Sequence, residues 1–263
     1  MLKQRVVTAL VLLAVLIPVL FFLPAVFAIV TFALITMLAA WEWSRLLLAS
    51  IAGRVIFPLS ILACCGLSLL YPPLQLWMCA LAAGFWLLVP LWLAWRWPLP
   101  HGLMGYLVGA VVLLPAWISM TRLHEWGPWQ LLAALALVWV ADIAAYFVGR
   151  AMGRHKLAPA ISPGKTWEGA AGAVIGGLAY VFFLQRYASL YISANMAVLA
   201  LGTTLLVAVS IIGDLFESMI KRQAGVKDSS QLLPGHGGIL DRIDSLTSML
   251  PVLVVASSFW PQT

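Results

Sequence analysis

The stretch from Met196 to Asp244 reads MAVLALGTTLLVAVSIIGDLFESMIKRQAGVKDSSQLLPGHGGILDRID and joins an apolar run to the densest group of charges in the chain. The apolar part, with the residues that follow it, is long enough for a helix that crosses a membrane. The second part holds five of the nine acidic residues of the whole sequence. An ionisable group at membrane depth is costly unless it is paired, hydrated or bound to a metal. The clustering therefore predicts a functional site at the end of a membrane helix.

Four polar residues of this stretch follow one another at helical spacing: Ser210, Asp214, Ser218 and Lys221. They share one face of a helix, which should face protein or a water-filled cavity rather than lipid. The residues PGHGG at 234–238 then predict a turn, because glycine tolerates positive φ and lets backbone N–H groups approach a ligand closely. A second helix should begin near Ile239 and carry Asp241 and Asp244 on one face of its first turns.

The residues of Ser218–Asp244 follow the order SxxKRx4KDxSx2LPxHGGx2DRxD, which resembles the motif of the phosphatidate cytidylyltransferase family. An ordered set of this length is far less expected by chance than a short nucleotide-binding motif. The resemblance extends upstream to DxxAYxxG at Asp142–Gly149 and to SPGKTWEG at Ser162–Gly169. The positively charged start of the chain and its overall length also fit the bacterial enzymes.

Composition is typical of an integral membrane protein, since 63% of the residues are hydrophobic and 9% are charged, with a mean hydropathy of +1.03. The longest segment without a span, 150–168, is too short for an independent domain. We therefore expect one all-α, membrane-embedded unit over 1–263, in which 1–130 is mainly scaffold and 131–263 carries the site. The net charge of +6 is too dispersed for a nucleic-acid surface, so no nucleic-acid partner is expected.

Nine segments are apolar and are bounded by charge, proline or glycine, as transmembrane helices are. They lie at about 6–22, 25–43, 55–71, 74–95, 102–121, 130–148, 169–186, 196–217 and 245–260. With the N terminus in the cytoplasm, all Lys and Arg residues except Arg122 and Arg186 fall on the cytoplasmic side. This bias predicts nine spans, a cytoplasmic N terminus, an external C terminus and a charged site on the cytoplasmic face of a bacterial inner membrane.

The resemblance implies that CTP condenses with phosphatidic acid, a membrane lipid, to give CDP-diacylglycerol and pyrophosphate. Mg²⁺ suits this chemistry, because it prefers hard oxygen ligands and takes one or two carboxylates together with substrate phosphates. Asp214 and Asp241 lie on different helices that the intervening turn can bring together, so they are the first candidates for ligands. Asp244 is a further candidate ligand, and a second cation is left open.

The motif residues supply the candidates for the remaining roles. Candidate catalytic and phosphate-contacting residues are Asp142, Lys165, Asp214, Lys221, Arg222, Lys227, Asp228, His236, Asp241, Arg242 and Asp244. Candidates for holding the nucleotide are Ser162, Gly164, Lys165, Thr166, Gly237 and Gly238. The sequence offers His236 no histidine or cysteine at metal-binding spacing, so a loop or phosphate contact is favoured for it.

Plainer interpretations stay open for several of these residues. Asp142 could serve only a hydrogen bond between helices. SPGKTWEG lacks the spacing and the preceding strand of a Walker motif, so it could be a simple turn. The charges of 213–244 could all be structural salt bridges. Outside the motifs, Glu42 and Arg45 are spaced as a helix-end ion pair rather than as a catalytic set.

Two other classes of protein fit the pattern less well. An ion-coupled transporter also carries charge inside a helical bundle, but it should show matching halves, whereas here the charge is concentrated in the last half. Another membrane enzyme of CTP or CDP-lipid chemistry, such as a CDP-alcohol phosphotransferase or a CTP-dependent lipid kinase, should carry other acid spacings. A homodimer is left open as a partner.

Overall fold

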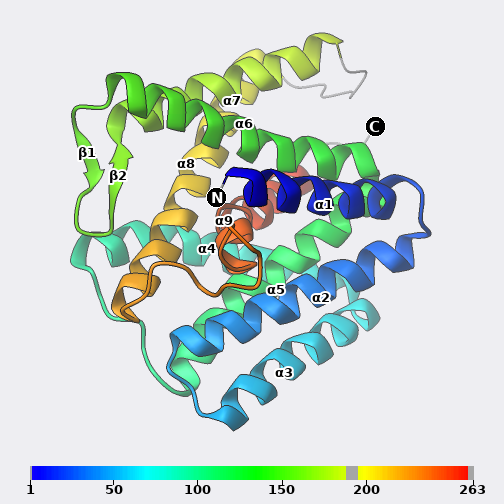
Figure 1. The fold of residues 1–263 in the computed structure, drawn as a ribbon. Helices are drawn as coiled ribbons and strands as arrows, with labels where there is room; N and C mark the ends of the chain where they lie inside the picture. The colour runs from blue at the N-terminus through cyan, green and yellow to red at the C-terminus, as the bar shows by residue number, and fades with distance from the viewer. Residues whose placement is uncertain (1, 188–194, 260–263) are drawn as a thin grey trace.

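The computed structural model describes residues 2–187 and 195–259, which form nine α-helices and one β-hairpin (Figure 1). The helices are α1 (Leu2–Phe21), α2 (Ala25–Leu46), α3 (Ile51–Leu70), α4 (Pro72–Trp95), α5 (Leu103–Trp126), α6 (Pro128–Met152), α7 (Trp167–Tyr187), α8 (Met196–Gln223) and α9 (Leu240–Ser258). The hairpin consists of β1 (Lys156–Ala158) and β2 (Ser162–Thr166). Met1, and residue 260 at the end of the last expected span, lie outside the described residues.

Each apolar segment expected from the sequence coincides with one of these helices, so the all-α architecture is confirmed. Seven of them, α2 to α8, are long and apolar enough to cross a membrane. The apolar part of α1 is shorter, at Val6–Phe21, and α9 begins with the charged residues of the motif. The structure is therefore that of an integral membrane protein, and the number of nine crossings stays a prediction.

The hairpin between α6 and α7 is a feature that the sequence analysis treated as a loop. Its strands pair antiparallel, with Lys156 opposite Thr166 and Ala158 opposite Ser162. A further backbone hydrogen bond, from Trp167 N–H to the His155 carbonyl at 2.9 Å, continues the pairing to the start of α7. Strands this short and polar give little periodic signal in a sequence. Their consequence is that Lys165 sits on an ordered strand and not on a free loop.

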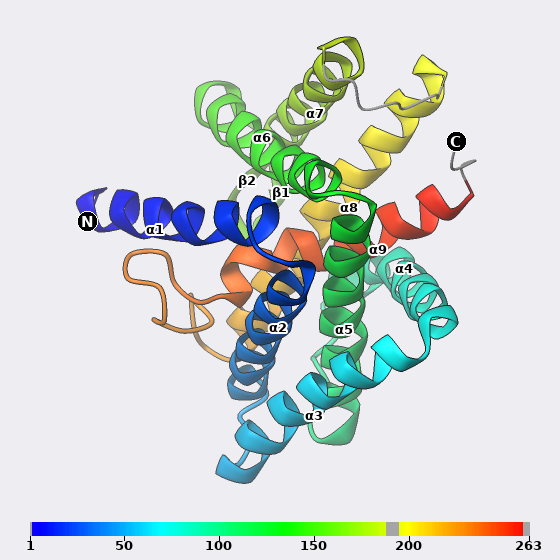
Figure 2. The same ribbon diagram turned by 90° about the vertical axis from the view of Figure 1, so that its right-hand side faces the viewer.

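The centre of the molecule is built around α9, which packs against α4, α5 and α8 (Figures 1 and 2). Gly213 lies at a close approach between α8 and α9. A Cβ atom at Gly213 would lie 2.3 Å from Ser248 Oγ and 2.8 Å from the Asp244 carbonyl oxygen of α9. Small residues allow helices in membranes to approach this closely. The glycine thus sets the next residue, Asp214, beside the charged start of α9.

A second close approach joins α6 to α7. A Cβ atom at Gly172 of α7 would lie 2.6 Å from the Val148 Cβ of α6, and one at Gly176 would lie 2.6 Å from the Ala144 Cβ. The small residues of α7 therefore let the two helices pack backbone to backbone. This contact brings the hairpin that precedes α7 back to the C-terminal end of α6, near Gly149.

Candidate active site

Lys165 and Asp214 form an ion pair that joins two of the sequence motifs. Lys165 projects from β2 and Asp214 from α8, and Lys165 Nζ lies 2.6 Å from Asp214 Oδ2. Ser218, one helical turn beyond Asp214, donates to the other carboxylate oxygen, Oδ1, at 3.3 Å. The side chains of Lys165 and Asp214 are 25% and 29% exposed. Because both remain partly accessible, a ligand can reach this pair without unfolding the helices.

Two more carboxylates interact electrostatically with this pair. Asp142 of α6 lies close enough to Asp214, Lys165 and Arg242 for their charges to interact. Asp244 of α9 likewise interacts with the charges of Asp214 and Lys165. The charges of Lys165, Arg242 and three carboxylates, carried on four separate elements, therefore interact at this place. Asp214 and Asp241 were expected to converge, whereas the carboxylates whose charges interact with Asp214 here are Asp142 and Asp244.

Lys221 forms the second, more buried charged group. Its Nζ lies 2.5 Å from Glu217 Oε2 and 2.5 Å from Asp241 Oδ1, and these three side chains are at most 10% exposed. The other oxygen of Glu217, Oε1, is buried and has no hydrogen-bond partner among the residues that the structure describes. A single ammonium group therefore balances two buried carboxylates, which makes Lys221 a structural requirement of the fold as it stands.

Asp241 holds the loop that leads from α8 to α9. Its Oδ2 accepts hydrogen bonds from the Gly238 N–H at 2.7 Å, the Ser229 N–H at 3.0 Å and the Ser229 hydroxyl at 2.9 Å. Both Asp241 oxygens are thus engaged, and Asp214 is engaged separately with Lys165. Within residues 2–187 and 195–259, no group of three or more His, Cys, Asp and Glu side chains is arranged to hold a metal ion.

The PGHGG turn has the backbone conformation that its glycines predict. Gly235 and Gly237 have φ values of 77° and 82°, and Leu233 N–H donates to the Gly237 carbonyl at 2.9 Å. A Cβ atom at Gly237 would lie 2.6 Å from Asp241 Oδ2. The Nδ1 atom of His236 is buried without a hydrogen-bond partner in the described part of the chain. The close approach made by Gly237 is therefore to a carboxylate of the protein itself.

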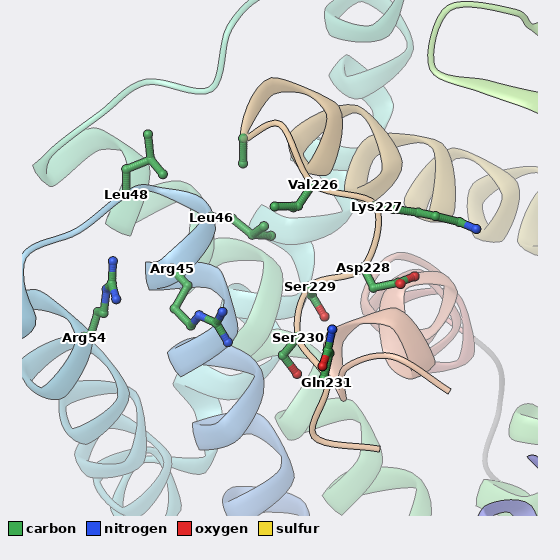
Figure 3. A pocket seen from close by; sticks show the side chains of 11 residues that line it. Arg45, Leu46, Leu48, Arg54, Val226, Lys227, Asp228, Ser229, Ser230 and Gln231 are labelled. Atoms are coloured by element: carbon green, nitrogen blue, oxygen red, sulfur yellow. The ribbon is translucent and has the colours of Figure 1, made fainter. Parts of the chain in front are cut away.

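Three further motif residues lie around the loop and a neighbouring cavity. Arg222 donates to the carbonyls of Ile161 at 3.4 Å and Val226 at 3.1 Å, which ties the hairpin to the loop. Lys227 and Asp228 are exposed. They help to line a cavity of about 610 Å³ whose other residues are Arg45, Leu46, Leu48, Arg54, Ala224, Val226, Ser229, Ser230 and Gln231. Figure 3 shows the side chains of Lys227 and Asp228 pointing away from those of Arg45 and Arg54.

The residues expected to cradle phosphate on the SPGKTWEG motif have different surroundings. Thr166 is buried, and its Oγ1 accepts a hydrogen bond from the Gly169 N–H at 3.1 Å, as the side chain that caps α7. Gly164 is open, with no atom within 4 Å of an added Cβ. Ser162 begins β2. Lys165 is the member of this set that the structure brings to the carboxylates.

Glu42 is the residue whose importance the sequence analysis missed. In the described part of the chain it forms no ion pair with Arg45, so that expectation was wrong; Arg45 instead lies over the ring of Trp41, 4.8 Å from its centroid. Glu42 is fully buried and accepts hydrogen bonds from the α8–α9 loop and from the start of α9. The signal was present, because an acid in an apolar helix needs a buried partner, the argument applied to Asp142.

Known proteins similar to this chain point to one family. The sequence profile of the cytidylyltransferase family matches residues 3–260. A phosphatidate cytidylyltransferase of Pseudomonas aeruginosa is 42% identical over 99% of this chain and 97% of the relative. One from Haemophilus influenzae is 37% identical over 95% of this chain and 96% of the relative. One from Staphylococcus epidermidis is 46% identical over a shorter part, 47% of this chain and 46% of the relative.

Proposed function

Because this chain belongs to the cytidylyltransferase family and is a CTP-dependent phosphatidate cytidylyltransferase, we propose that Lys165 and Asp214, with the carboxylates beside them, form its active site. The substrates of the family are CTP and phosphatidic acid. The observation that carries the proposal is the 2.6 Å pair between Lys165 Nζ and Asp214 Oδ2. It unites two motifs that are far apart in the sequence, at a place that remains partly exposed.

The reaction needs positioning and charge neutralisation more than it needs acid–base chemistry. A phosphate oxygen of phosphatidic acid bonds to the α-phosphorus of CTP, and the bond from that phosphorus to the β-phosphate oxygen breaks to release pyrophosphate. The attacking phosphate is already anionic, so a strong general base is not required. Lys165 can turn from Asp214 to a phosphate oxygen, and Arg242, exposed at the start of α9, can meet another. Such preorganised cations lower the barrier of phosphoryl transfer.

The donor set at this place fits a magnesium ion. The carboxylate oxygens of Asp214 and Asp244 are hard ligands, and Mg²⁺ takes one or two carboxylates together with substrate phosphates. When bound there, Mg²⁺ would polarise the phosphate oxygens and stabilise the pyrophosphate leaving group. Asp241 can contribute only by exchanging its contact with Lys221, because its other oxygen is held by the loop.

The course of the reaction can be tested with labelled CTP. Purified protein in detergent, given phosphatidic acid, Mg²⁺ and CTP labelled on the α-phosphate, should transfer the label to a lipid, while label on the γ-phosphate should appear in pyrophosphate. Omitting phosphatidic acid is the control and should leave both labels in CTP. Release of CDP would indicate a CTP-dependent lipid kinase, and release of CMP when CDP-diacylglycerol and an alcohol replace CTP and phosphatidic acid would indicate a CDP-alcohol phosphotransferase. Either product would contradict the proposed reaction.

The orientation that we propose is nine crossings with the N terminus and the charged site in the cytoplasm. Two observations support it. The Thr8 hydroxyl of α1 donates to the Pro234 carbonyl at 2.9 Å, which places the first turns of α1 beside the PGHGG turn. The start of α1 and the end of α9 lie on opposite sides of the molecule (Figure 2). The excess of Lys and Arg on the side of the loop agrees with a cytoplasmic location.

Reporter fusions at the two ends of the chain test this orientation. A fluorescent protein, which folds only in the cytoplasm, should be bright at the N terminus and dark at the C terminus. Alkaline phosphatase, which is active only outside, should show the reverse. Two ends on the same side would contradict nine crossings and would indicate that α1 or α9 does not cross the membrane.

A further inference from the structure

Glu42 of α2 joins two parts of the loop between α8 and α9 by hydrogen bonds. The carboxylate is 0% exposed and accepts hydrogen bonds from two segments of the loop, one at Ser229 and Ser230 and one at its junction with α9. Its Oε1 accepts from the Ser230 hydroxyl at 2.5 Å and from the Ile239 N–H at 3.0 Å. Its Oε2 accepts from the Ser229 hydroxyl at 2.9 Å and from the Leu240 N–H at 2.6 Å. Each oxygen therefore binds one hydroxyl from the start of the loop and one backbone N–H from its end.

This arrangement accounts for a buried acid that has no Lys, Arg or His within ion-pair distance in the part of the chain that the structure describes. The N-terminal N–H groups of a helix have no partner within the helix, and the helix dipole there attracts negative charge. Glu42 supplies that charge to α9 from another helix. A buried carboxylate that accepts several such hydrogen bonds is well satisfied without a cation.

Gly238 is the residue that allows this contact. A Cβ atom at Gly238 would lie 2.1 Å from Ser229 Oγ and 2.5 Å from Glu42 Oε1. No larger residue fits between the carboxylate and the loop. This motif glycine, expected from the sequence to help hold the nucleotide, lies against Glu42 on the side where a Cβ atom would be.

The contact also extends to the charged residues of the site. Ser229 Oγ lies 2.9 Å from Glu42 Oε2 and 2.9 Å from Asp241 Oδ2. Its one proton is shared between the two carboxylates, and Asp241 is in turn paired with Lys221. The same loop carries Lys227 and Asp228 and forms a wall of the 610 Å³ cavity. A shift of Glu42 would therefore move the loop, Asp241 and the cavity wall together.

We propose that Glu42 is a positioning residue for CTP: it holds the Ser229–Leu240 loop in the conformation that binds the nucleotide, without touching the reacting atoms. The inference rests on the active site proposed above. The loop lies beside Arg45 in the last turn of α2 and Arg54 in the first turn of α3, at the helix ends that the orientation proposed above places in the cytoplasm. A soluble, multiply charged nucleotide reaches that place, whereas the acyl chains of the lipid substrate stay in the membrane.

The test is the kinetics of Glu42→Gln in the purified full-length enzyme. Gln keeps the shape of the side chain, but its NH₂ group is a donor and must face the backbone N–H of Ile239 or Leu240, which is also a donor. That backbone N–H is fixed by the helix and cannot rotate away. We expect kcat/KM for CTP to fall about tenfold or more, because a hydrogen bond to a charged group is lost. The KM for phosphatidic acid should stay within about twofold, since the proposal assigns the loop to the binding of the nucleotide alone.

Ser44→Ala is the matched control. Ser44 is fully buried on the same helix, and its hydroxyl bonds to the Trp41 carbonyl at 2.7 Å within that helix, away from the loop. Its kinetics should match those of the unmodified enzyme. Ser230→Ala removes a loop donor to Glu42 while the carboxylate stays. If the two residues act through one contact, the double variant with Glu42→Gln should lose no more activity than Glu42→Gln alone.

A readout that needs no activity separates this inference from the active-site proposal. Release of the loop should speed tryptic cleavage after Lys227 in Glu42→Gln and in Ser230→Ala, and leave it unchanged in Ser44→Ala. Faster cleavage with the expected loss toward CTP supports the inference. Three results would overturn the inference. The first is unchanged cleavage in a folded Glu42→Gln, and the second is an equal rise in KM for both substrates. The third is a loss of activity in the double variant that equals the product of the two single losses. If Glu42→Gln does not fold, Ser230→Ala decides on the same two measurements.

Discussion

Replacing Asp214 with Asn lowers the rate of CDP-diacylglycerol synthesis by about a hundredfold to a thousandfold, the usual cost of losing one well-placed charged group in an active site. Asp214 is the carboxylate that pairs with Lys165, and its charge interacts with those of Asp142 and Asp244. Asn is nearly the same size but has one neutral acceptor oxygen, which binds Mg²⁺ poorly. The initial rate with saturating CTP and phosphatidic acid, measured over a Mg²⁺ titration, gives the size of the effect. Higher Mg²⁺ should restore part of the lost rate.

The fold should survive this substitution, because Asp214 is partly exposed and surface-accessible ion pairs contribute little, about 0–1 kcal/mol. Glu125→Gln is the control, since Glu125 is an exposed acid near the end of α5 and belongs to none of the motifs. It should keep the full rate and the ordinary Mg²⁺ dependence. A folded Asp214→Asn enzyme that works at the unmodified rate would remove Asp214 from the proposed site.

Replacing Lys221 with Met destabilises the protein by about 3–5 kcal/mol, the cost of breaking a buried ion pair by removing one partner. Lys221 neutralises Glu217 and Asp241 together, at 2.5 Å from each. Met retains the apolar stem but leaves two buried carboxylates facing each other without a cation. Circular dichroism during SDS unfolding in detergent micelles measures the free energy of unfolding.

Lys165→Met is the matched control for this stability prediction. Lys165 also pairs with an aspartate, at 2.6 Å, but the side chains of that pair are about a quarter exposed. Its loss should change the free energy of unfolding by about 1 kcal/mol or less, while activity falls because a phosphate partner is removed. Equal loss of stability in the two variants would show that Lys221 is not the distinct, structural cation that the geometry indicates.

The three-membered group around Lys221 also changes what is expected of Asp241. If Lys221 were paired only with Asp241, the substitution Asp241→Asn would leave a buried cation without a carboxylate. Lys221 is also paired with Glu217, so it keeps one charged partner. The main consequence of that substitution is therefore a weaker loop, because Asp241 Oδ2 accepts from Ser229 and Gly238. Sequence spacing alone suggested that Asp241 and Asp214 were equivalent metal ligands. The structure shows that their surroundings differ.

The membrane class, the helices and the clustering of charge around the end of α8 could be predicted from the sequence. Apolar runs, helical spacing and turn glycines are local signals, and each reports on residues that are neighbours in the chain. The start of α9 after the PGHGG turn and the positive φ of Gly235 and Gly237 belong to this group. The concentration of acidic residues in the last half of the chain also belongs to this group. A charge within a membrane segment is costly, so such residues indicate a site before any fold is known.

The partners of those charges were decided only by the tertiary structure. Lys165 and Asp214 meet because Gly172 and Gly213 let helices approach closely, and no local pattern states which helices those are. Glu42 lies 197 residues from one of its hydrogen-bond donors, Ile239. The sequence by itself determined that acids inside apolar helices need compensation, since a buried charge is costly unless it is paired or hydrogen-bonded. Which group supplies the compensation depends on distances of a few ångströms between helices, and only the packed bundle sets those distances.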